Sequence, residues 1–390
     1  MPQAYNPNDA LALMLGGGGA RGAYQAGVLR GMAKRFPNLS FPILAGISAG
    51  AVNTIHLASH EGPLEQAADD LIALWLALSP ERVYDVRAAP LLRNAFEWGS
   101  RLLSGGIGTG GEPMRGMVAT EPLRRFLNGV LERAPDGSLP GIGRNLDRGT
   151  LKAVALSATS YSTGQSLTWI EGRNVELWQR PQRRTENTKL TVEHVLASSA
   201  LPMLFPAVKV DGQWYGDGGV RLTAPLSPSL HLGASRIITI STKYQRTRAE
   251  ADQPLTVGYP PPAQVLGVLY NAVFLDLIDE DILRLQTVNQ LLRQMKHDQR
   301  EKMRIVDILV LRPSCDLGKL ASEFEPRLPG LFRYLTRGLG TRRTASPDFI
   351  SLILFQKDYL KRLIDIGEED AAMQGDQIEE FLARPLADTV

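Results

Sequence analysis

The sequence predicts an α/β protein with a mostly parallel central sheet sandwiched by helices. Its first sixty residues alternate between two short apolar runs of strand length and two segments of helical periodicity. The order strand, helix, strand, helix is that of a βαβ unit, in which the crossover helix makes the two strands parallel. A glycine-rich turn follows each strand directly, so both turns are expected to emerge at the same edge of the sheet.

The first strand is predicted at residues 11–15 (LALML), and a run of four glycines begins directly after it. From residue 23 to residue 36 the apolar side chains are spaced for one buried helix face. This segment therefore supplies the crossover helix of the unit, and the glycines lie between the strand and the helix.

The second strand is predicted at residues 42–45, and the pentapeptide G-x-S-x-G follows it at Gly46–Gly50. A helix is expected at residues 51–58, so the serine, Ser48, lies where a strand turns sharply into a helix. This is the setting of a nucleophile elbow, in which glycines on both sides let the strand and the helix pass closely. Taken alone, the pentapeptide is equally consistent with a glycine-rich turn and a capping serine.

The remaining elements follow from apolar periodicity and turn signals. Helices are predicted at residues 65–78, 192–200, 263–300 (interrupted) and 348–366, and strands at 151–157, 166–170, 207–210, 213–215, 236–241 and 305–311. Residues 180–189 are predicted to be a basic, polar loop. We expect one domain, with an N-terminal tail (1–9), a catalytic core (10–242) and a mainly helical C-terminal extension (243–390) packed on the core.

The composition is that of a soluble globular protein, with 390 residues, 44% hydrophobic residues, 22% charged residues and a net charge of +2. So small a net charge predicts no nucleic-acid partner. The single cysteine, Cys315, excludes an intramolecular disulfide. Neither a signal peptide nor a membrane span is recognised, so we expect a cytoplasmic protein whose contact with membranes, if any, is peripheral.

The glycine loop after the first strand has two interpretations. The spacing of Gly17, Gly19 and Gly22 matches a dinucleotide-binding fingerprint, but that site needs an acidic residue about 20 positions later. No Asp or Glu occurs between Asp9 and Glu61, which leaves a dinucleotide-binding oxidoreductase as a distant alternative. The favoured interpretation is an oxyanion hole, in which backbone N–H groups of successive glycines face Ser48.

A serine nucleophile needs a base, and Asp217 is a better candidate than any of the five histidines. Only about 45 residues precede Ser48, too few for the strands that an α/β-hydrolase with a histidine triad requires before its elbow. His231 is the fallback candidate. Asp217 lies in a D-G-G sequence, which usually marks an exposed turn. If partial burial raised its pKa toward neutrality, its carboxylate could accept the Ser48 proton.

The ordered set of motifs resembles the patatin-like phospholipase family. Residues 17–22 (GGGARG) match its oxyanion motif, Gly46–Gly50 its nucleophile motif and residues 217–219 (DGG) the motif that supplies the aspartate of a Ser–Asp dyad. Residues 197–206 (ASSALPMLFP) match a further block that has no proposed catalytic task. The resemblance is firm from about residue 10 to about residue 242 and looser beyond, and it implies a patatin-like fold.

The resemblance implies a lipid acyl hydrolase, either phospholipase A-like or a lysophospholipase or esterase, that forms an acyl-serine intermediate. Ser48 and Asp217 would be catalytic. The residues expected to form or shape the oxyanion hole and the turns are Gly17, Gly18, Gly19, Ala49, Arg21, Gly22, Gly46, Gly50, Gly218 and Gly219. Arg21 would organise the loop or contact an anionic head group. An acyl-CoA thioesterase or an acyltransferase with the same dyad is the alternative.

We expect no cofactor and no metal. The acidic residues at 276–281 lack the spacing of a calcium-binding loop and are interpreted as a solvated helix face. Residues 100–117 are glycine-rich and are a candidate lid. The basic stretches 180–189, 293–304 and 333–343 would meet anionic lipid head groups or would be ordinary solvated charge. The sequence predicts no oligomeric state.

Overall fold

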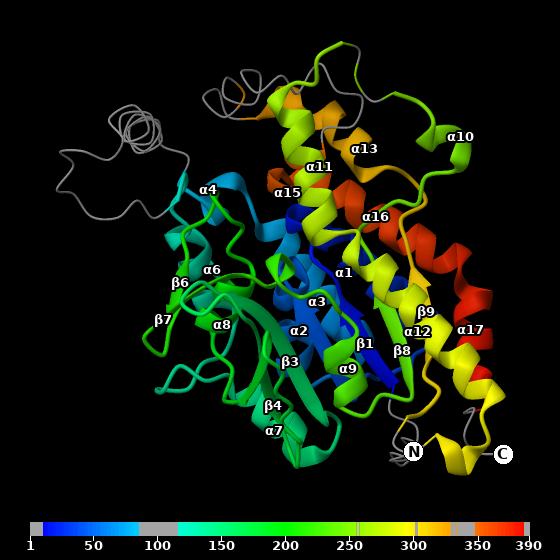
Figure 1. Ribbon diagram of the computed structural model, residues 1–390. Coiled ribbons are helices and arrows are strands. Elements are labelled where there is room, and N and C mark those ends of the chain that lie inside the picture. Colours follow the sequence, from blue (N-terminus) through cyan, green and yellow to red (C-terminus); the bar gives the residue numbers. More distant parts are fainter. Residues whose placement is uncertain are drawn as a thin grey trace.

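The computed structural model describes residues 11–85, 116–254, 256, 258–300, 303–328, 333 and 348–385 (Figure 1). The expected tail at residues 1–9 lies outside the described residues. The same holds for nearly all of the candidate lid, residues 100–117, and for most of the basic stretch 333–343.

The described strands form one nine-stranded sheet with the main order β5-β4-β3-β2-β1-β8-β9, while β7 pairs with β3 and β6 with β7. The strands are β1 (Leu11–Leu15), β2 (Ile43–Ile47), β3 (Ala153–Ser160), β4 (Ser166–Gly172), β5 (Arg183–Asn187), β6 (Val208–Val210), β7 (Gln213–Asp217), β8 (Arg236–Ile240) and β9 (Asp307–Leu311). The pairs β1–β2, β1–β8, β2–β3, β8–β9 and β4–β5 are parallel. The predicted mostly parallel sheet is therefore confirmed.

Helices cover both faces of this sheet (Figure 1). The described α-helices are α1 (Gly22–Arg35), α2 (Ala49–Ser59), α3 (Leu64–Ala77), α4 (Pro80–Val83), α6 (Glu121–Val130), α7 (Pro140–Arg148), α8 (Val192–Ser198), α9 (Ser227–His231), α10 (Arg248–Ala251), α11 (Pro262–Phe274), α12 (Leu277–Gln294), α13 (Leu317–Phe324), α15 (Asp348–Ile353), α16 (Lys357–Met373) and α17 (Gly375–Ala383). Helices α1, α3 and α16 pack on one face, and α12 packs on the other with residues that flank α9.

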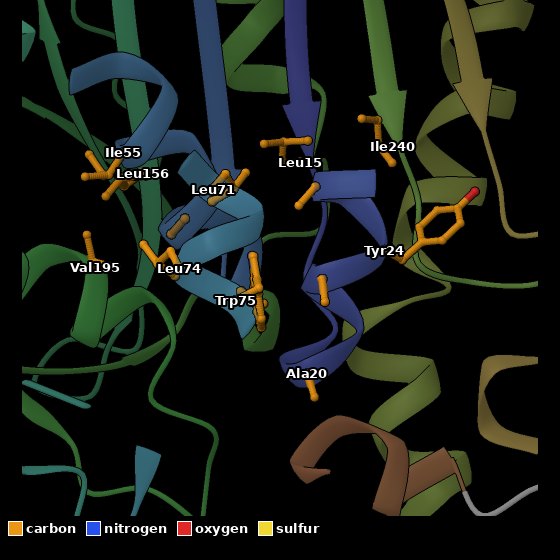
Figure 2. Close-up of a cluster of buried hydrophobic side chains, with 14 of the residues drawn as sticks. Leu15, Ala20, Tyr24, Ile55, Leu71, Leu74, Trp75, Leu156, Val195 and Ile240 are labelled. Atoms are coloured by element: carbon orange, nitrogen blue, oxygen red, sulfur yellow. The ribbon is translucent and has the colours of Figure 1, made fainter. Parts of the chain in front are cut away.

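Strand β1 shows why its sequence is apolar throughout. Leu13 and Leu15 belong to the core beneath α1 and α16, whereas Ala12 and Met14 belong to the core beneath α12. Successive side chains of a strand point to opposite faces, so a central strand with helices on both sides must be apolar at every position. Figure 2 shows Leu15 in the first of these cores, near Tyr24 of α1 and Trp75 of α3.

Two predictions about secondary structure are wrong in detail. The predicted loop at residues 180–189 contains β5, which extends the sheet beside β4. Only Thr185 of this strand is buried, and its charged neighbours are tolerated because β5 is an edge strand. The predicted helix at residues 348–366 is broken between α15 and α16. The residues at the break include Phe355. Its ring stacks on that of Trp75, with the ring centroids 6.5 Å apart.

The C-terminal extension contributes to the sheet as well as covering it. Strand β9 pairs in parallel with β8, as expected if residues 305–311 rejoin the sheet. Helix α16 makes a long contact with α1, the crossover helix of the first βαβ unit. The extension therefore lies against the same unit that carries the glycine loop.

Candidate active site

Ser48 lies between β2 and α2 with a backbone φ of 57° and ψ of −128°. A positive φ is unfavourable for a residue with a side chain and is kept only where the surroundings enforce it. The flanking glycines do this. A Cβ on Gly46 would lie 2.3 Å from Thr54 Oγ1, and one on Gly50 would lie 2.1 Å from the carbonyl oxygen of Leu15. Neither glycine can be replaced without moving the elbow.

The glycine loop lies beside the elbow because β1 and β2 are paired, with Leu15 opposite Gly46. A Cβ on Gly17 would lie only 3.1 Å from Ser48 Cβ. Gly18 and Gly19 have φ values of 148° and 54°, in the region that favours glycine. Among the described residues, the N–H groups of Gly18 and Gly19 donate no hydrogen bond to the protein.

Two further glycines of the predicted site are enclosed as tightly. A Cβ on Gly22 would lie 2.7 Å from the ring of Trp75, and one on Gly218 would lie 2.2 Å from the carbonyl oxygen of Ser157. Gly219 faces Phe274 of α11, whose Cδ1 would be 2.4 Å from an added Cβ. The turn after Asp217 is therefore buried, unlike the exposed turn that a D-G-G sequence usually forms.

Asp217 ends β7 and is fully buried. Its Oδ1 accepts a hydrogen bond of 2.9 Å from the Gly219 N–H, and its Oδ2 accepts none from the described residues. Burial raises the pKa of Asp217 to about 7, although the Ser48 hydroxyl and the Gly219 N–H both lower it. The Ser48 hydroxyl is thus one of the two groups that act against the effect of burial on this carboxyl group.

Ser198, at the end of α8, completes the elbow. The backbone N–H of Ser48 donates to Ser198 Oγ over 3.1 Å, and Ser198 Oγ donates to the carbonyl oxygen of Ser157 over 2.7 Å. Sequence reasoning gave this residue no role. Its signal was present, since it belongs to the block at residues 197–206 that matched the family motif without a catalytic assignment.

The four histidines with described side chains have partners elsewhere. His231 stacks on Trp178, with ring centroids 4.3 Å apart, and burial followed by nearby arginines lowers its pKa. His194 forms a capping box with Thr191, and burial lowers its pKa to about 4. His56 bonds the Ala67 carbonyl, and His60 pairs with Asp70. None of these side chains contacts Ser48, and the side chain of His297 lies outside the described residues.

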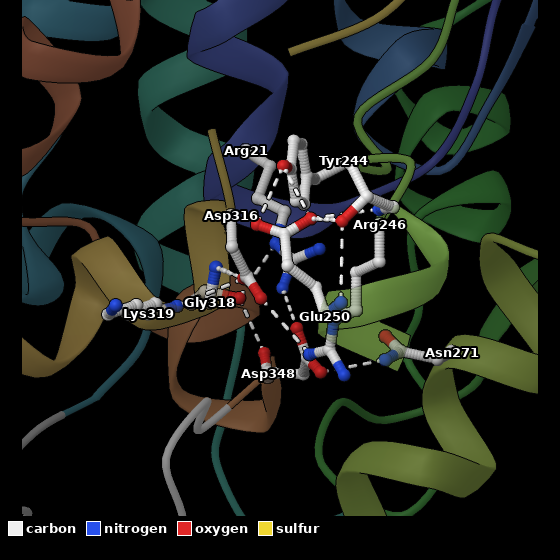
Figure 3. Close-up of polar contacts among 11 residues, drawn as sticks. Arg21, Tyr244, Arg246, Glu250, Asn271, Asp316, Gly318, Lys319 and Asp348 are labelled. Carbon is white, nitrogen blue, oxygen red and sulfur yellow. Dashed lines mark hydrogen bonds and ion pairs between the residues drawn. The ribbon is translucent and has the colours of Figure 1, made fainter. Parts of the chain in front are cut away.

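Arg21 is almost wholly buried, and its side chain lies in a cluster of polar residues that includes Asp348 (Figure 3). Its Nη2 lies 2.6 Å from Asp348 Oδ1, and its Nε donates to Ser351 Oγ over 2.7 Å. A side chain that is 3% exposed and has two such partners is not placed to meet a lipid head group. Of the two expected roles, the geometry favours the organising one.

Three of the four acidic residues at 276–281 have partners in the protein, and the fourth, Glu280, is exposed. Lys243 Nζ lies 2.7 Å from Asp276 and 2.8 Å from Asp279, and Asp279 also pairs with Arg312. Asp281 is buried and accepts a hydrogen bond from the Leu226 N–H, so the interpretation as a solvated helix face is wrong for this residue. In the described part of the chain, no group of three or more His, Cys, Asp or Glu side chains is arranged to hold a metal ion.

A narrow apolar cavity of about 40 Å³ is lined by Ser48 and by residues of α3, α6 and the segment after α15. Gly19 and Ala49, on either side of Ser48 in the glycine loop and the elbow, also line it. The remaining lining residues are Val52, Leu74, Trp75, Leu78, Val83, Leu123, Phe126, Leu127, Ser199, Leu201, Phe205 and Phe355. Figure 2 shows the Leu74 and Trp75 side chains on α3. Sequence reasoning missed this wall because its residues come from separate elements and each looks like ordinary core.

The chain is similar to one protein family and to several solved structures. A family model described as "Patatin-like phospholipase" matches residues 13–230. No curated protein matches the chain. Solved structures that match include VipD from Legionella pneumophila (14% identity, 92% of this chain, 67% of that chain, TM-score 0.33). They also include human GIVD cytosolic phospholipase A2 (14%, 96%, 58%, 0.43) and the ExoU–SpcU complex from Pseudomonas aeruginosa (15%, 96%, 76%, 0.27). The chain thus spans little more than half the length of the human enzyme.

Proposed function

Because the chain belongs to the patatin-like phospholipase family, we propose that it is a lipid acyl hydrolase whose catalytic dyad is Ser48 and Asp217. The observation that carries this proposal is the Asp217 carboxyl group, fully buried beside the Ser48 hydroxyl with a pKa raised to about 7. A general base works best when its pKa is near the operating pH, because it is then both ionised and able to hold a proton.

The reaction proceeds in two balanced steps. Asp217 takes the proton of Ser48 Oγ while Oγ attacks the ester carbonyl carbon. When the tetrahedral intermediate collapses, the ester C–O bond breaks and the leaving alkoxide takes the proton from Asp217. A water molecule then gives a proton to Asp217 and attacks the acyl-serine, and the fatty acid leaves as Ser48 Oγ regains its proton.

The oxyanion of each intermediate is held by backbone N–H groups. Those of Gly18 and Gly19 donate no hydrogen bond to the described residues and belong to the loop that lies against Ser48. The N–H of Ala49 is the first of α2, so the positive end of that helix dipole supports the same charge. Gly17 leaves room for the substrate because a side chain there would touch Ser48.

The apolar cavity supports a fatty acyl chain as the part of the substrate that is recognised. Ser48 lines it, and its lining side chains other than Ser48 and Ser199 are all apolar. Transfer of each buried methylene of an acyl chain from water to such a wall contributes about 0.8 kcal/mol. The phospholipase A-like, lysophospholipase and esterase activities differ in the group attached to that chain and share this recognition.

Peripheral contact with a lipid surface forms part of the proposal. No described helix is long and apolar enough to span a membrane. Helix α11 carries an exposed stripe without any charged residue, formed by Pro262, Val265, Val268, Leu269 and Ala272. Its Val268 and Leu269 are each 55% exposed. The last residue of the helix, Phe274, lies against Gly219 of the site, so lipid bound at this stripe would lie near the proposed dyad.

Labelling with a fluorophosphonate probe tests the nucleophile, and hydrolysis of short nitrophenyl esters tests the dyad. The wild-type protein is expected to be labelled, Ser48→Ala to be neither labelled nor active, and Asp217→Asn to lose most activity. Ser229→Ala is the matched control, since Ser229 is a buried serine whose hydroxyl has no hydrogen-bond partner among the described residues. Labelling of Ser48→Ala would refute the nucleophile, and full activity of Asp217→Asn would refute the dyad.

The substrate class is tested with a panel of phospholipids, monoacylglycerols and acyl-CoA esters. A lipid acyl hydrolase is expected to favour the oxygen esters over the thioesters. Preference for acyl-CoA would indicate the thioesterase or acyltransferase that uses the same dyad, and addition of an acceptor alcohol would separate those two.

A further inference from the structure

The C-terminal extension reaches the glycine loop directly. We propose that Asp348 of α15 is a positioning residue, which holds the oxyanion loop in its active geometry through Arg21. Asp348 lies more than a hundred residues beyond the stretch that matches the family model, residues 13–230. This inference rests on the proposed function, because the position of the loop matters for the rate only if the loop holds the oxyanion.

The contact between Arg21 and α15 is specific in geometry. Arg21 Nη2 lies 2.6 Å from Asp348 Oδ1, while its Nε donates to Ser351 Oγ over 2.7 Å (Figure 3). The guanidinium group is planar and rigid, so two acceptors three residues apart on one helix determine both its position and its orientation. The side chains of Arg21 and Asp348 are only 3% and 13% exposed, so water screens this pair weakly.

The backbone of the loop lies against the same helix. A Cβ on Gly19 would be 2.0 Å from the carbonyl oxygen of Leu352, so no side chain separates the loop from α15. On its other side the loop touches Ser48 through Gly17. The loop is therefore enclosed between the elbow and α15. A shift of α15 would move the loop relative to the nucleophile.

Arg21 is connected to the proposed oxyanion donors, Gly18 and Gly19, through the backbone. It ends the 3-10 turn Gly19–Arg21, and its own N–H donates to the Gly18 carbonyl over 3.0 Å. Because of this rigid connection, displacement of the guanidinium group moves the N–H groups of Gly18 and Gly19. A misplacement of about 1 Å in such a site can cost about 100-fold in rate.

Asp348 is itself held from a second direction. Its Oδ2 accepts a hydrogen bond of 2.8 Å from Asn271 Nδ2 of α11 (Figure 3). One carboxylate thus joins Arg21 of the glycine loop to the helix that carries the exposed apolar stripe. Oδ1 and Oδ2 of Asp348 thus have different partners. An acid that only neutralised a buried arginine would not need the second one.

The test compares Asp348→Asn with a matched control, Glu368→Gln. Glu368 of α16 also joins the extension to α1, where it pairs with Arg30 and Lys34, but it has no contact with the glycine loop. For Asp348→Asn we expect a fall of about 100-fold in kcat for a short nitrophenyl ester, with KM unchanged. The rate of fluorophosphonate labelling should fall in parallel, and Glu368→Gln should keep both rates.

Combined variants show whether Asp348 acts through Arg21. Arg21→Lys and Asp348→Asn together should lose little more than Asp348→Asn alone, because both disturb one pair. If Asp348→Asn does not fold, Ser351→Ala removes the second Arg21 acceptor and is expected to lower kcat more mildly, again without a change in KM.

The outcomes separate this inference from the proposed function. A wild-type protein that is not labelled would refute both. A labelled wild type with undiminished kcat in Asp348→Asn and in Ser351→Ala would refute the positioning role alone. Losses that add fully in the double variant, or equal losses in Glu368→Gln, would also refute it, since they would indicate a general effect on the fold.

Discussion

The backbone N–H of Ser48 and the side-chain oxygen of Ser198 lie 3.1 Å apart and form a buried hydrogen bond. The Ser198 hydroxyl donates a hydrogen bond to the carbonyl oxygen of Ser157 on β3 over 2.7 Å. One hydroxyl group thus joins the elbow, α8 and the sheet. The Ser48 backbone has a positive φ, and this bond is one of the contacts that enforce it.

Ser198→Ala should therefore weaken both the fold and the activity. It leaves the Ser48 N–H and the Ser157 carbonyl without their buried partner, so we expect the free energy of unfolding to fall by about 2 kcal/mol. We also expect a reduced kcat, because the nucleophile is held less firmly. Urea unfolding and ester hydrolysis measure the two effects. If Ser198→Ala behaved like the control Ser229→Ala, the bond would have no role in the elbow.

The activity should depend on pH through Asp217. Only its ionised form can accept the Ser48 proton, and burial raises its pKa to about 7. We therefore expect kcat/KM for a soluble ester to rise between about pH 5 and pH 8, with its midpoint near 7. Initial rates across this range measure it. A midpoint near the ordinary pKa of an aspartate would show that a different group limits the reaction.

The burial of Asp217 should also lower the free energy of unfolding at alkaline pH. The pKa of Asp217 is raised in the folded state. Its contribution to the free energy of unfolding is therefore most favourable below the pKa of the unfolded chain, where both states hold the proton. This contribution is lost as the pH rises through about 7, and it amounts to at most about 4 kcal/mol. Asp217→Asn, which stays neutral, should thus have a higher Tm than the wild type at pH 8 and a similar Tm near pH 4. Equal Tm differences at both pH values would contradict this account.

Phe355 should limit the length of the acyl chain that is accepted. It lines the narrow cavity and stacks on Trp75, so a smaller side chain there would open the apolar end. Phe355→Leu is expected to shift the preference in a series of nitrophenyl esters toward longer chains, as measured by kcat/KM. Phe324→Leu is the control, because Phe324 packs on Tyr359 and does not line the cavity. An unchanged preference in Phe355→Leu would place the acyl chain elsewhere.

The exposed stripe of α11 should bind lipid surfaces. Val268→Ser together with Leu269→Ser removes apolar side chains that are already in solvent, so little stability is lost. Burial of two such side chains contributes a few kcal/mol to membrane binding. Cosedimentation with phosphatidylcholine vesicles should therefore fall by at least about tenfold while hydrolysis of a soluble ester is kept. The control is Leu283→Ser with Leu291→Ser on α12, two exposed leucines outside the stripe. Equal vesicle binding by both double variants would exclude this stripe.

Much of the sheet could be predicted from the sequence because its signals are local. The strand at residues 11–15 was recognised with the same bounds as β1, and the elbow glycines marked the turn after β2. Strand β5 was missed because only Thr185 of its five residues is buried, so it has no apolar pattern to read. The break before α16 was missed because apolar residues continue through it and pack against α3.

In the candidate site, too, some residues could be predicted from local sequence and others could not. The motifs at Ser48 and Asp217 are short sequences that can be recognised locally, whereas the burial of Asp217 depends on the folded chain. Asp348 could not be found from the sequence, because an acid at the start of a helix is usual there and its partner lies 327 residues away. The walls of the cavity were hidden for a related reason, since Leu123 and Phe355 meet only after the chain has folded.

The distance in sequence between Arg21 and Asp348 has a consequence for how the protein is made. Ser48 and Asp217 are synthesised well before α15. A nascent chain therefore contains both residues without the helix that supports the glycine loop. If α15 sets the reactivity of the serine, the full rate of hydrolysis is reached only after the chain has been synthesised beyond residue 351 and α15 has packed on the loop.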